Sequence, residues 1–238
     1  MSAKPPDPRV LAQLEELTLD PTRPLLAVDA DEVMVLLAAH LKRFLASHDI
    51  VFRLTSYRLE GSMIPVGSET PIAFEDCLTW IGRFFESEVT RQEEVEGAAA
   101  ALERLADLAQ IMVLTNVPRH GKPGRIENLA ALGMGYPLVE NAGGKGPALA
   151  WMAERVGRPM IFIDDSRNQI ASAATTCPEV ERIHFTGAEL VCDVLDPAPE
   201  AQHHAKSWAE AEAICRRLLA RAGPTLENTA PAEPEGSL

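Results

Sequence analysis

Short runs of apolar residues recur along the chain, and each run ends in polar or turn-forming residues. These runs cover residues 25–28, 111–115, 137–140, 160–163 and 182–186. Continuous apolar runs of this length are typical of strands buried on both faces of a parallel sheet. Amphipathic helical patterns follow three of the runs, at residues 124–134, 144–157 and 166–176. The pattern predicts an α/β fold with a Rossmann-like open parallel sheet, right-handed crossovers and helices on both faces.

The segment between the first two predicted strands is too long for an ordinary crossover. It carries helical patterns at residues 33–49, 74–87 and 93–109, and a Gly/Ser/Pro-punctuated stretch at 52–71 that fits a β-hairpin. We therefore expect a mostly helical cap inserted over the strand ends. The predicted division is an N-terminal arm at 1–22, an α/β core at 23–34 and 108–220, the cap insertion at 35–107 and a disordered tail at 221–238.

Polar side chains follow three of the predicted strands at the points where the strands end. They are Asp29 and Asp31 after the first strand, Thr115 and Asn116 after the second, and Asp164 and Asp165 after the fourth, while Lys145 opens the helix before the fourth strand. Each feature alone fits turn or helix-cap chemistry. Ligands of open α/β sheets bind beyond the carboxyl ends of the strands. The presence of all these polar residues at such ends therefore favours one shared site.

Clustered carboxylates repel one another, and a bound cation removes this repulsion. Mg²⁺ fits oxygen ligands of this kind, because it typically takes one or two carboxylates and shares its remaining positions with water and phosphate. With phosphate bound, one carboxylate can act as the nucleophile and a second, two residues on, can transfer the protons. Thr115, Asn116 and Lys145 are then expected to bind the substrate, since a hydroxyl and an ammonium stabilise phosphoryl oxygens.

The order of these motifs, D-x-D, then Thr, then Lys, then D-D, resembles the haloacid dehalogenase (HAD) superfamily in its phosphatase branch. The resemblance extends over residues 25 to 187. It implies a Rossmann-like sheet, Mg²⁺ as cofactor and a helical cap of the C1 type that closes over the site and supplies much of the specificity. A small phosphorylated metabolite is the implied substrate.

The resemblance also implies a role for each matching residue. Asp29 matches the nucleophile, and Asp31 matches the acid/base, whose backbone carbonyl also helps to hold Mg²⁺. The other matching positions are Thr115 for orienting the phosphoryl group, Lys145 for stabilising it, and Asp164 with Asp165 for binding the metal. The sequence departs from the family where Glu32 and Val33 follow Asp31, since many members have glycine or threonine there.

Three other classes of protein share parts of this pattern. A response-regulator receiver domain has its acidic pair at the first strand and its lysine last, which is the reverse of the order here. A metal-dependent glycosyltransferase uses D-x-D but leaves Thr115, Lys145 and the late acidic pair without a role. A non-catalytic or regulatory ligand-binding protein on the same scaffold stays open, because fold alone does not fix the reaction.

Composition narrows the partners. The formal net charge is -13, from 35 acidic and 22 basic residues. This charge disfavours sequence-independent binding to nucleic acid and binding to an anionic membrane surface. The 4 cysteines show no paired short spacing, so neither a zinc site nor a disulfide framework is indicated. The sequence shows no signal-peptide or membrane-spanning pattern, so we expect a cytoplasmic location. We expect the protein to be a monomer or a homodimer.

Several other polar residues have weaker indications of a role. Arg119, His120 and Lys122 follow the second predicted strand, where they fit either a contact with a substrate anion or a solvated loop. His203 and His204 lie in the polar stretch "PEAQHHAKS" and are interpreted as linker residues.

Overall fold

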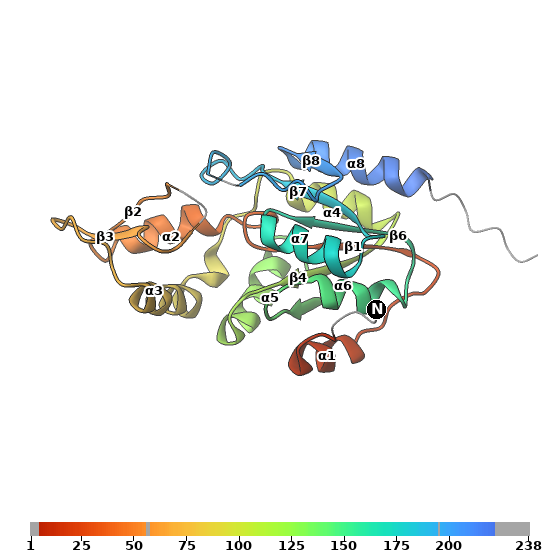
Figure 1. The fold of residues 1–238 in the computed structure, drawn as a ribbon, viewed down its shortest axis with the longest axis horizontal. Coiled ribbons are helices and arrows are strands. Elements are labelled where there is room, and N and C mark those ends of the chain that lie inside the picture. The colour runs from red at the N-terminus through yellow and green to blue at the C-terminus, as the bar shows by residue number, and fades with distance from the viewer. Residues whose placement is uncertain (1–4, 56–57, 195, 222–238) are drawn as a thin grey trace, which may run out of the picture.

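The computed structural model describes residues 5–55, 58–194 and 196–221. Of the predicted disordered tail, residues 222–238 lie outside this described part. A 6-stranded sheet forms the centre of the molecule, in the order β5-β4-β1-β6-β7-β8 (Figure 1). Every adjacent pair of strands in this sheet is parallel. The predicted α/β fold class with a Rossmann-like parallel sheet is confirmed.

All of the strands predicted from the apolar runs are present. They are β1 (Pro24–Val28), β4 (Gln110–Thr115), β5 (Leu138–Glu140), β6 (Gly157–Asp164) and β7 (Glu181–Phe185). The sequence analysis missed the edge strand β8 (His203–Ala205), which pairs with β7. His203 and His204 therefore belong to the sheet, and their interpretation as linker residues is wrong. An edge strand tolerates polar side chains, because one of its sides faces solvent.

Helices cover both faces of the sheet. One face packs against α4 (Ala98–Ala106), α5 (Lys122–Ala131) and α8 (Trp208–Arg221). The other packs against α1 (Pro8–Glu15), α6 (Gly146–Ala153) and α7 (Arg167–Thr176). Alternate residues of β1 point to the two faces, Leu26 and Val28 to the first and Leu25 and Ala27 to the second. The continuous apolar run of β1 follows from this double burial.

The N-terminal arm covers the edge of the sheet at β5. Gln13 of α1 donates from Nε2 to the carbonyl oxygen of Glu140 at 3.0 Å, and its Oε1 accepts from the N–H of Glu140 at 3.0 Å. One side chain thus satisfies both backbone groups of an edge residue, as a neighbouring strand would. Val10 and Leu14 of the same helix are buried in the core beneath it.

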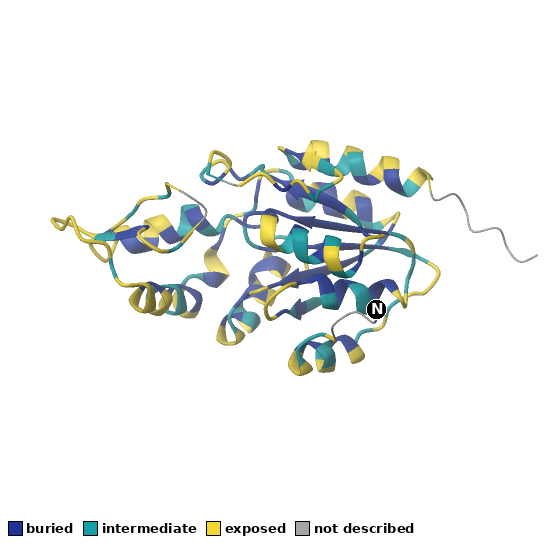
Figure 2. Cartoon of the chain, viewed as in Figure 1, coloured by how far each residue is buried: buried dark blue, intermediate teal, exposed yellow. Residues whose placement is uncertain are grey.

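The segment after β1 forms a separate lobe on the left of Figure 1, beyond the carboxyl ends of the strands. It consists of α2 (Leu37–Ala46), the antiparallel pair β2 (Ile50–Phe52) and β3 (Met63–Pro65), α3 (Phe74–Ser87) and the short helix η1 (Val89–Arg91). Its buried residues form a hydrophobic cluster of their own, which Figure 2 shows in dark blue between the exposed helix faces. The segment contains helices and an antiparallel strand pair as expected, although α2 begins at Leu37 and β2 at Ile50 rather than at the predicted positions 33 and 52.

Helix α4 lies within the core rather than in this lobe. Its buried residues Ala98, Ala101, Leu102 and Leu105 share a cluster with β1, β4 and α8. On the surface, Arg104 of α4 donates to Glu212 of α8 at 2.6 Å. We therefore propose that the insertion ends near residue 97, ahead of the predicted boundary at 107. Chain entry and exit lie side by side, since Val35 pairs antiparallel with Glu94.

The described part of the chain bears on two further predictions. No helix within it is both long enough and apolar enough to cross a membrane. The 4 cysteines, Cys77, Cys177, Cys192 and Cys215, carry free thiols.

Candidate active site

The first predicted pair of carboxylates lies at the carboxyl end of the central strand β1. The N–H of Asp29 donates to the carbonyl oxygen of Ile163 at 3.0 Å, which extends the β1–β6 ladder by one residue. The chain then turns sharply, because the N–H groups of Met34 and Val35 both donate to the carbonyl oxygen of Ala30. Asp29 is 7 % exposed, and Asp31 within the turn is half-buried.

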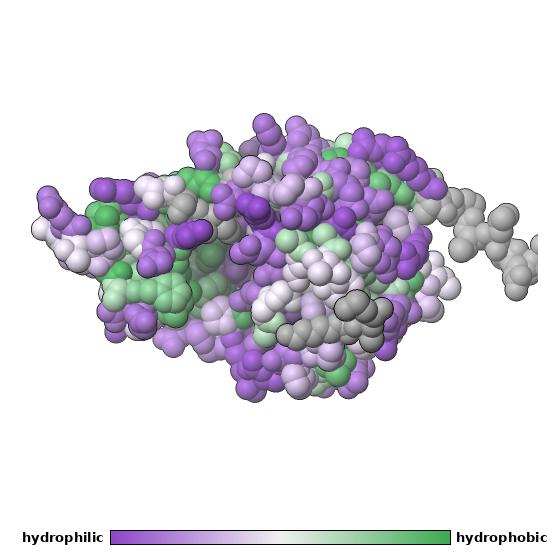
Figure 3. Space-filling model, viewed as in Figure 1, coloured by the Kyte–Doolittle hydropathy of each residue, from purple (hydrophilic) through white to green (hydrophobic). Residues whose placement is uncertain are grey.

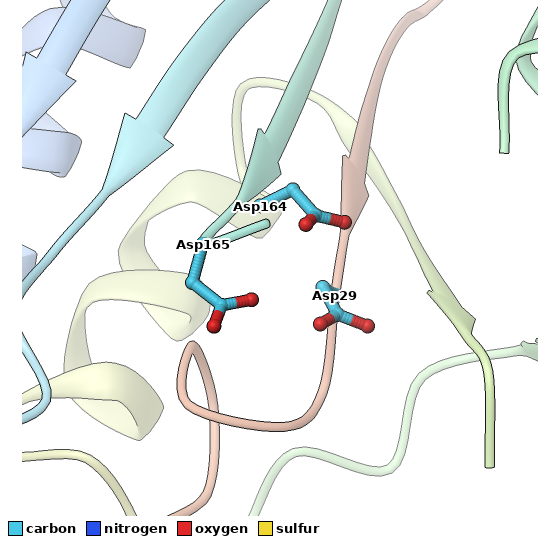
Figure 4. A group of neighbouring side chains, drawn as sticks. All are labelled: Asp29, Asp164 and Asp165. Atoms are coloured by element: carbon cyan, nitrogen blue, oxygen red, sulfur yellow. The ribbon is translucent and has the colours of Figure 1, made fainter. Parts of the chain in front are cut away.

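Three of the predicted carboxylates converge. Asp29 at the end of β1 and Asp164 and Asp165 at the end of β6 each offer an oxygen, and these oxygens lie within 4.8 Å of one another. Figure 4 shows the three carboxylates turned toward one common volume. All three residues are buried, which makes their mutual repulsion costly without a cation. The side chain of Asp31 is outside this group.

Lys145 supplies a positive charge inside the carboxylate cluster. Its Nζ lies 2.5 Å from Asp29 Oδ1 and 2.6 Å from Asp164 Oδ2. Burial opposes the charge of this lysine, but the two carboxylates outweigh burial and raise its pKa above the usual value. Burial, and to a smaller extent the nearby Asp29, raise the pKa of Asp164 to about 7 against the lowering effect of Lys145. One ammonium therefore leaves the cluster short of positive charge.

Close packing of α6 on α7 sets the position of Lys145. The N–H of Lys145 donates to Gln169 Oε1 at 2.8 Å, and the N–H of Gly146 donates to Ser172 Oγ at 3.0 Å. A Cβ on Gly146 would lie 2.2 Å from the carbonyl oxygen of Ser172, so only glycine fits. The glycine-rich stretch before α6 thus brings the lysine side chain to the strand ends.

Thr115 ends β4, the neighbour of β1 in the sheet. The residue is fully buried, and its Oγ1 has no hydrogen-bond partner among the described residues. Asn116 is exposed and holds two loops together: its Nδ2 donates to the carbonyl oxygen of Gly143 at 2.9 Å, and its Oδ1 accepts from Asn141 at 2.9 Å. A buried hydroxyl without a partner is costly, so the Thr115 hydroxyl suits an oxygen-rich ligand.

Asp31 pairs with Arg125, which the sequence analysis missed. Nη2 of Arg125 donates to Asp31 Oδ1, and Nη1 donates to Asn128 Oδ1 at 3.3 Å. Asn128 in turn donates from Nδ2 to the carbonyl oxygen of Gln92 at 2.8 Å, on the segment that leaves the insertion. The available signal was the i, i+3 spacing of Arg125 and Asn128 on the buried face of α5.

Burial is the largest influence on Asp31 and raises the pKa of its carboxyl group. Arg125 lowers this pKa, and the neighbouring Asp29 raises it. The net shift is upward, so Asp31 keeps its proton to a higher pH than an exposed aspartate does. A carboxyl group that keeps its proton to a higher pH is better suited to act as a general acid than an exposed aspartate.

Glu32 occupies an unusual position beside the catalytic candidates. Its backbone is left-handed, with a φ of 61°, and the residue is 2 % exposed. Oε1 accepts the N–H of Ala38 in the first turn of α2, whereas Oε2 has no hydrogen-bond partner among the described residues. Burial raises the pKa of this carboxyl group to about 7, and the Ala38 N–H opposes the rise.

The cationic residues after β4 have other partners. Lys122 Nζ donates to Gln13 Oε1 at 2.6 Å, and the Nε2 of His120 lies 3.2 Å from the carbonyl oxygen of Gly82. Arg119 is exposed. These contacts tie the core to α1 and to α3, and they leave Lys145 and Arg125 as the cations of the carboxylate site.

The parallel sheet with acidic residues at its strand ends defines an α/β protein of the open Rossmann-like class, with a site of metal-binding composition. No family model matches the sequence. No curated protein matches it either. Solved structures of similar fold do exist, and many of them are haloacid dehalogenase-like hydrolases.

The chain has the fold of these hydrolases. It resembles the HAD-hydrolase YfnB from Bacillus subtilis, solved bound to magnesium, with a TM-score of 0.55 and 14% identity over 81% of this chain and 98% of that one. The haloacid dehalogenase-like protein ATU0790 from Agrobacterium tumefaciens gives 0.57 and 16%, covering 82% and 98%. A HAD family hydrolase from Deinococcus radiodurans, with bound phosphate and sodium, gives 0.54 and 16%, covering 87% and 99%.

Proposed function

We propose that the protein is a HAD superfamily hydrolase that cleaves small phosphomonoesters with Mg²⁺ through an aspartyl-phosphate intermediate. The observation that carries this proposal is the convergence of Asp29, Asp164, Asp165 and Lys145. Thr115, whose hydroxyl has no partner among the described residues, ends the neighbouring strand β4. Carboxylates, an ammonium and a free hydroxyl donor together suit a metal-bound phosphoryl group. The Mg²⁺ in YfnB and the phosphate in the Deinococcus protein, both with similar folds, support the same ligands here.

The residues fit a magnesium ion by their chemistry. Oxygens of Asp29, Asp164 and Asp165 lie within 4.8 Å of one another, and burial together with the nearby Asp29 raises the pKa of Asp164, so a cation would stabilise its ionised form. These three side chains, with the backbone carbonyl of Asp31, would hold the ion. When bound, Mg²⁺ would offset the charge of the phosphoryl oxygens.

The chain's own residues perform the bond changes in this proposal. A carboxylate oxygen of Asp29 attacks phosphorus while the bond from phosphorus to the leaving oxygen breaks, and Asp31 gives that oxygen its proton. Asp31, now ionised, takes a proton from water as the water attacks phosphorus and releases Asp29. Lys145 and Thr115 bind phosphoryl oxygens in both steps.

The alternative is a non-catalytic or regulatory ligand-binding protein on the same scaffold. Dehalogenase chemistry is a further comparison, because a dehalogenase is among the structurally similar proteins. The carboxyl group of Asp31, with its raised pKa, favours phosphate-ester chemistry, which needs a proton for the leaving oxygen. We further propose a C1-type cap, a cytoplasmic location, a monomeric or homodimeric state and a small phosphorylated metabolite as substrate.

Phosphate release tests the proposal. Wild-type protein is assayed against p-nitrophenyl phosphate and a panel of metabolite phosphomonoesters, with Mg²⁺ and with chelator. We expect release only with the metal, because the buried carboxylates otherwise repel a phosphate dianion. Asp29→Asn should lower kcat by roughly 10⁴-fold or more, since it removes the nucleophile.

A second catalytic variant and a control variant accompany this assay. Asp31→Asn should slow turnover by about 10²–10⁴-fold, as expected for loss of a general acid and base. Glu86→Gln changes an exposed carboxylate of α3 and should leave turnover as it is. Undiminished release by folded Asp29→Asn protein would refute the nucleophile assignment. Absence of phosphate release by the wild-type protein with every compound of the panel would favour the alternative, a non-catalytic ligand-binding protein.

A further inference from the structure

An apolar cavity of about 200 Å³ lies where the insertion meets the core. Leu41 of α2, Phe52 of β2 and Ile81 of α3 form its insertion side, and Val191 closes it from the segment after β7. Figure 3 shows a hollow between the two lobes, with hydrophobic residues on the insertion side. At roughly 30 Å³ per water molecule, the volume corresponds to about six waters, enough for a short organic chain.

Glu32 and Arg58 are the charged residues among those that line this cavity, and Glu32 is the acidic one. Its Oε1 is explained by the fold, because α2 has no side-chain cap at Leu36 and the N–H of Ala38 needs an acceptor. Its Oε2 is not explained in this way, since it is buried and has no hydrogen-bond partner among the described residues. Buried carboxylate oxygens are normally paired, so this oxygen is suited to a ligand that donates a hydrogen bond.

The cavity is close to the proposed nucleophile. Glu32 follows Asp29 by three residues, and three residues of extended chain span at most about 11 Å. The sharp turn at residues 30–35 makes the actual path shorter than an extended chain. The Cα atoms of Asp29 and Glu32 are therefore less than about 11 Å apart, a distance that a short organic chain can span.

We propose that this cavity binds the leaving group of the substrate, and that the leaving group is a short apolar chain with a hydroxyl or ammonium donor paired to Glu32 Oε2. The proposal rests on the proposed function. The apolar walls exclude water from the chain, and the unpaired oxygen of Glu32 needs a hydrogen-bond donor. Glu32 thereby acts as a specificity determinant beside the reacting carboxylates.

The test uses matched ligands and a protein that does not turn them over. Calorimetry with Mg²⁺ measures the binding of n-butyl phosphate, 4-hydroxybutyl phosphate, 4-aminobutyl phosphate and 4-phosphooxybutanoate to Asp29→Asn protein. The hydroxyl or amino compound should bind about tenfold or more tightly than the butyl compound, as a hydrogen bond to a buried carboxylate implies. Which of the two gains identifies the donor. Tightest binding of the carboxylate compound would instead point to Arg58 as the recognising residue and overturn the assignment of Glu32.

The double variant Asp29→Asn/Glu32→Gln tests the residue. The amide keeps an oxygen for Ala38 and turns the other atom into a donor, so the tenfold preference should fall to about one. Asp29→Asn/Glu86→Gln, with an exposed carboxylate of α3 replaced, should keep the preference. If Glu32→Gln does not fold, Ile81→Phe in the cavity wall replaces it and should weaken all four ligands relative to inorganic phosphate.

Failure of this proposal differs from failure of the proposed function. Equal binding of the butyl and donor-bearing compounds, or a preference that survives Glu32→Gln, overturns the cavity assignment. Absence of binding by the whole series overturns it as well. If the cavity assignment fails but the wild-type protein releases phosphate from any of these compounds, the proposed phosphohydrolase function still stands. If the preference depends on Glu32 but no phosphate is released, the cavity assignment stands and only the proposed hydrolysis is refuted.

Discussion

At the residue scale, most side chains of the site could be predicted from the sequence, and one could not. Asp29, Thr115 and Lys145 could be predicted because polar residues at the ends of buried strands converge in a parallel sheet. The ion pair of Arg125 with Asp31 could not, because the partners are 94 positions apart and the arginine is on a helix face. Strand-end position predicts which carboxylates meet, whereas it says nothing about which cation each receives.

Arg125→Met should change the pH dependence of turnover. Arg125 lowers the pKa of Asp31, so its removal raises that pKa further. In the proposed mechanism protonated Asp31 is the general acid, and this form is lost as pH rises through the pKa. The alkaline limb of kcat/KM should therefore move to higher pH, with a lower kcat because the second step needs the carboxylate. Initial rates across the pH range measure both effects.

Exposed Arg119, in the loop after β4, provides the matched control for this experiment. Arg119→Met should leave the pH profile as in the wild type. An alkaline limb at its wild-type position in Arg125→Met would contradict the coupling of the two residues. Melting measured alongside should show a loss of roughly 3–5 kcal/mol, the usual cost of leaving one member of a buried ion pair without its partner.

At the element scale, hydrophobic periodicity predicted where the helices form, but it did not predict which elements they pack against. The pattern at residues 93–109 indicates a helix, and α4 forms there, but its apolar stripe does not say whether it faces the insertion or the core. Strand β8 escaped prediction because its residues, His203 to Ala205, have no apolar run. The missed strand and the packing side of α4 both depend on tertiary partners, which local sequence does not encode.

Two glycines in helices should respond oppositely to alanine. At Gly146, a Cβ meets the Ser172 carbonyl oxygen at 2.2 Å, so Gly146→Ala should push α6 off α7 and cost about 1–3 kcal/mol of unfolding free energy. At Gly82 in α3, a Cβ meets nothing within 4 Å, so Gly82→Ala should stabilise by about 0.5–1 kcal/mol. Denaturant unfolding measures both. Destabilisation of equal size by both variants would contradict the packing argument.

At the scale of the whole molecule, two lobes with separate hydrophobic clusters meet at the strand ends. The chain crosses between them twice, near Val35 and Glu94, and these two residues pair. The core carries the carboxylates, and the insertion supplies most of the cavity wall next to Glu32. The length of the insertion predicted a lobe over the site, but the cavity depends on contacts between lobes and could not be predicted from one sequence.

Metal binding should stabilise the folded protein as a whole. A ligand that binds only the native state adds about 2.7 kcal/mol at 100 times its Kd, so Mg²⁺ should raise the melting temperature of the wild type. Asp165→Asn removes one charge from the metal cluster and should reduce this rise, whereas Glu86→Gln should keep it. Differential scanning calorimetry at several Mg²⁺ concentrations measures the shift. A full rise in Asp165→Asn would exclude that carboxylate as a ligand.

Covalent capture of the phosphoryl group tests the central claim most directly. Wild-type protein is mixed with Mg²⁺ and a substrate from the phosphate-release panel, quenched in acid during turnover and digested for mass spectrometry. The mechanism predicts a phosphoryl group on the peptide that contains Asp29, and its absence in Asp29→Asn. Turnover with a phosphoryl group on a different residue, or with none at any quench time, would contradict the assignment of Asp29 as the nucleophile.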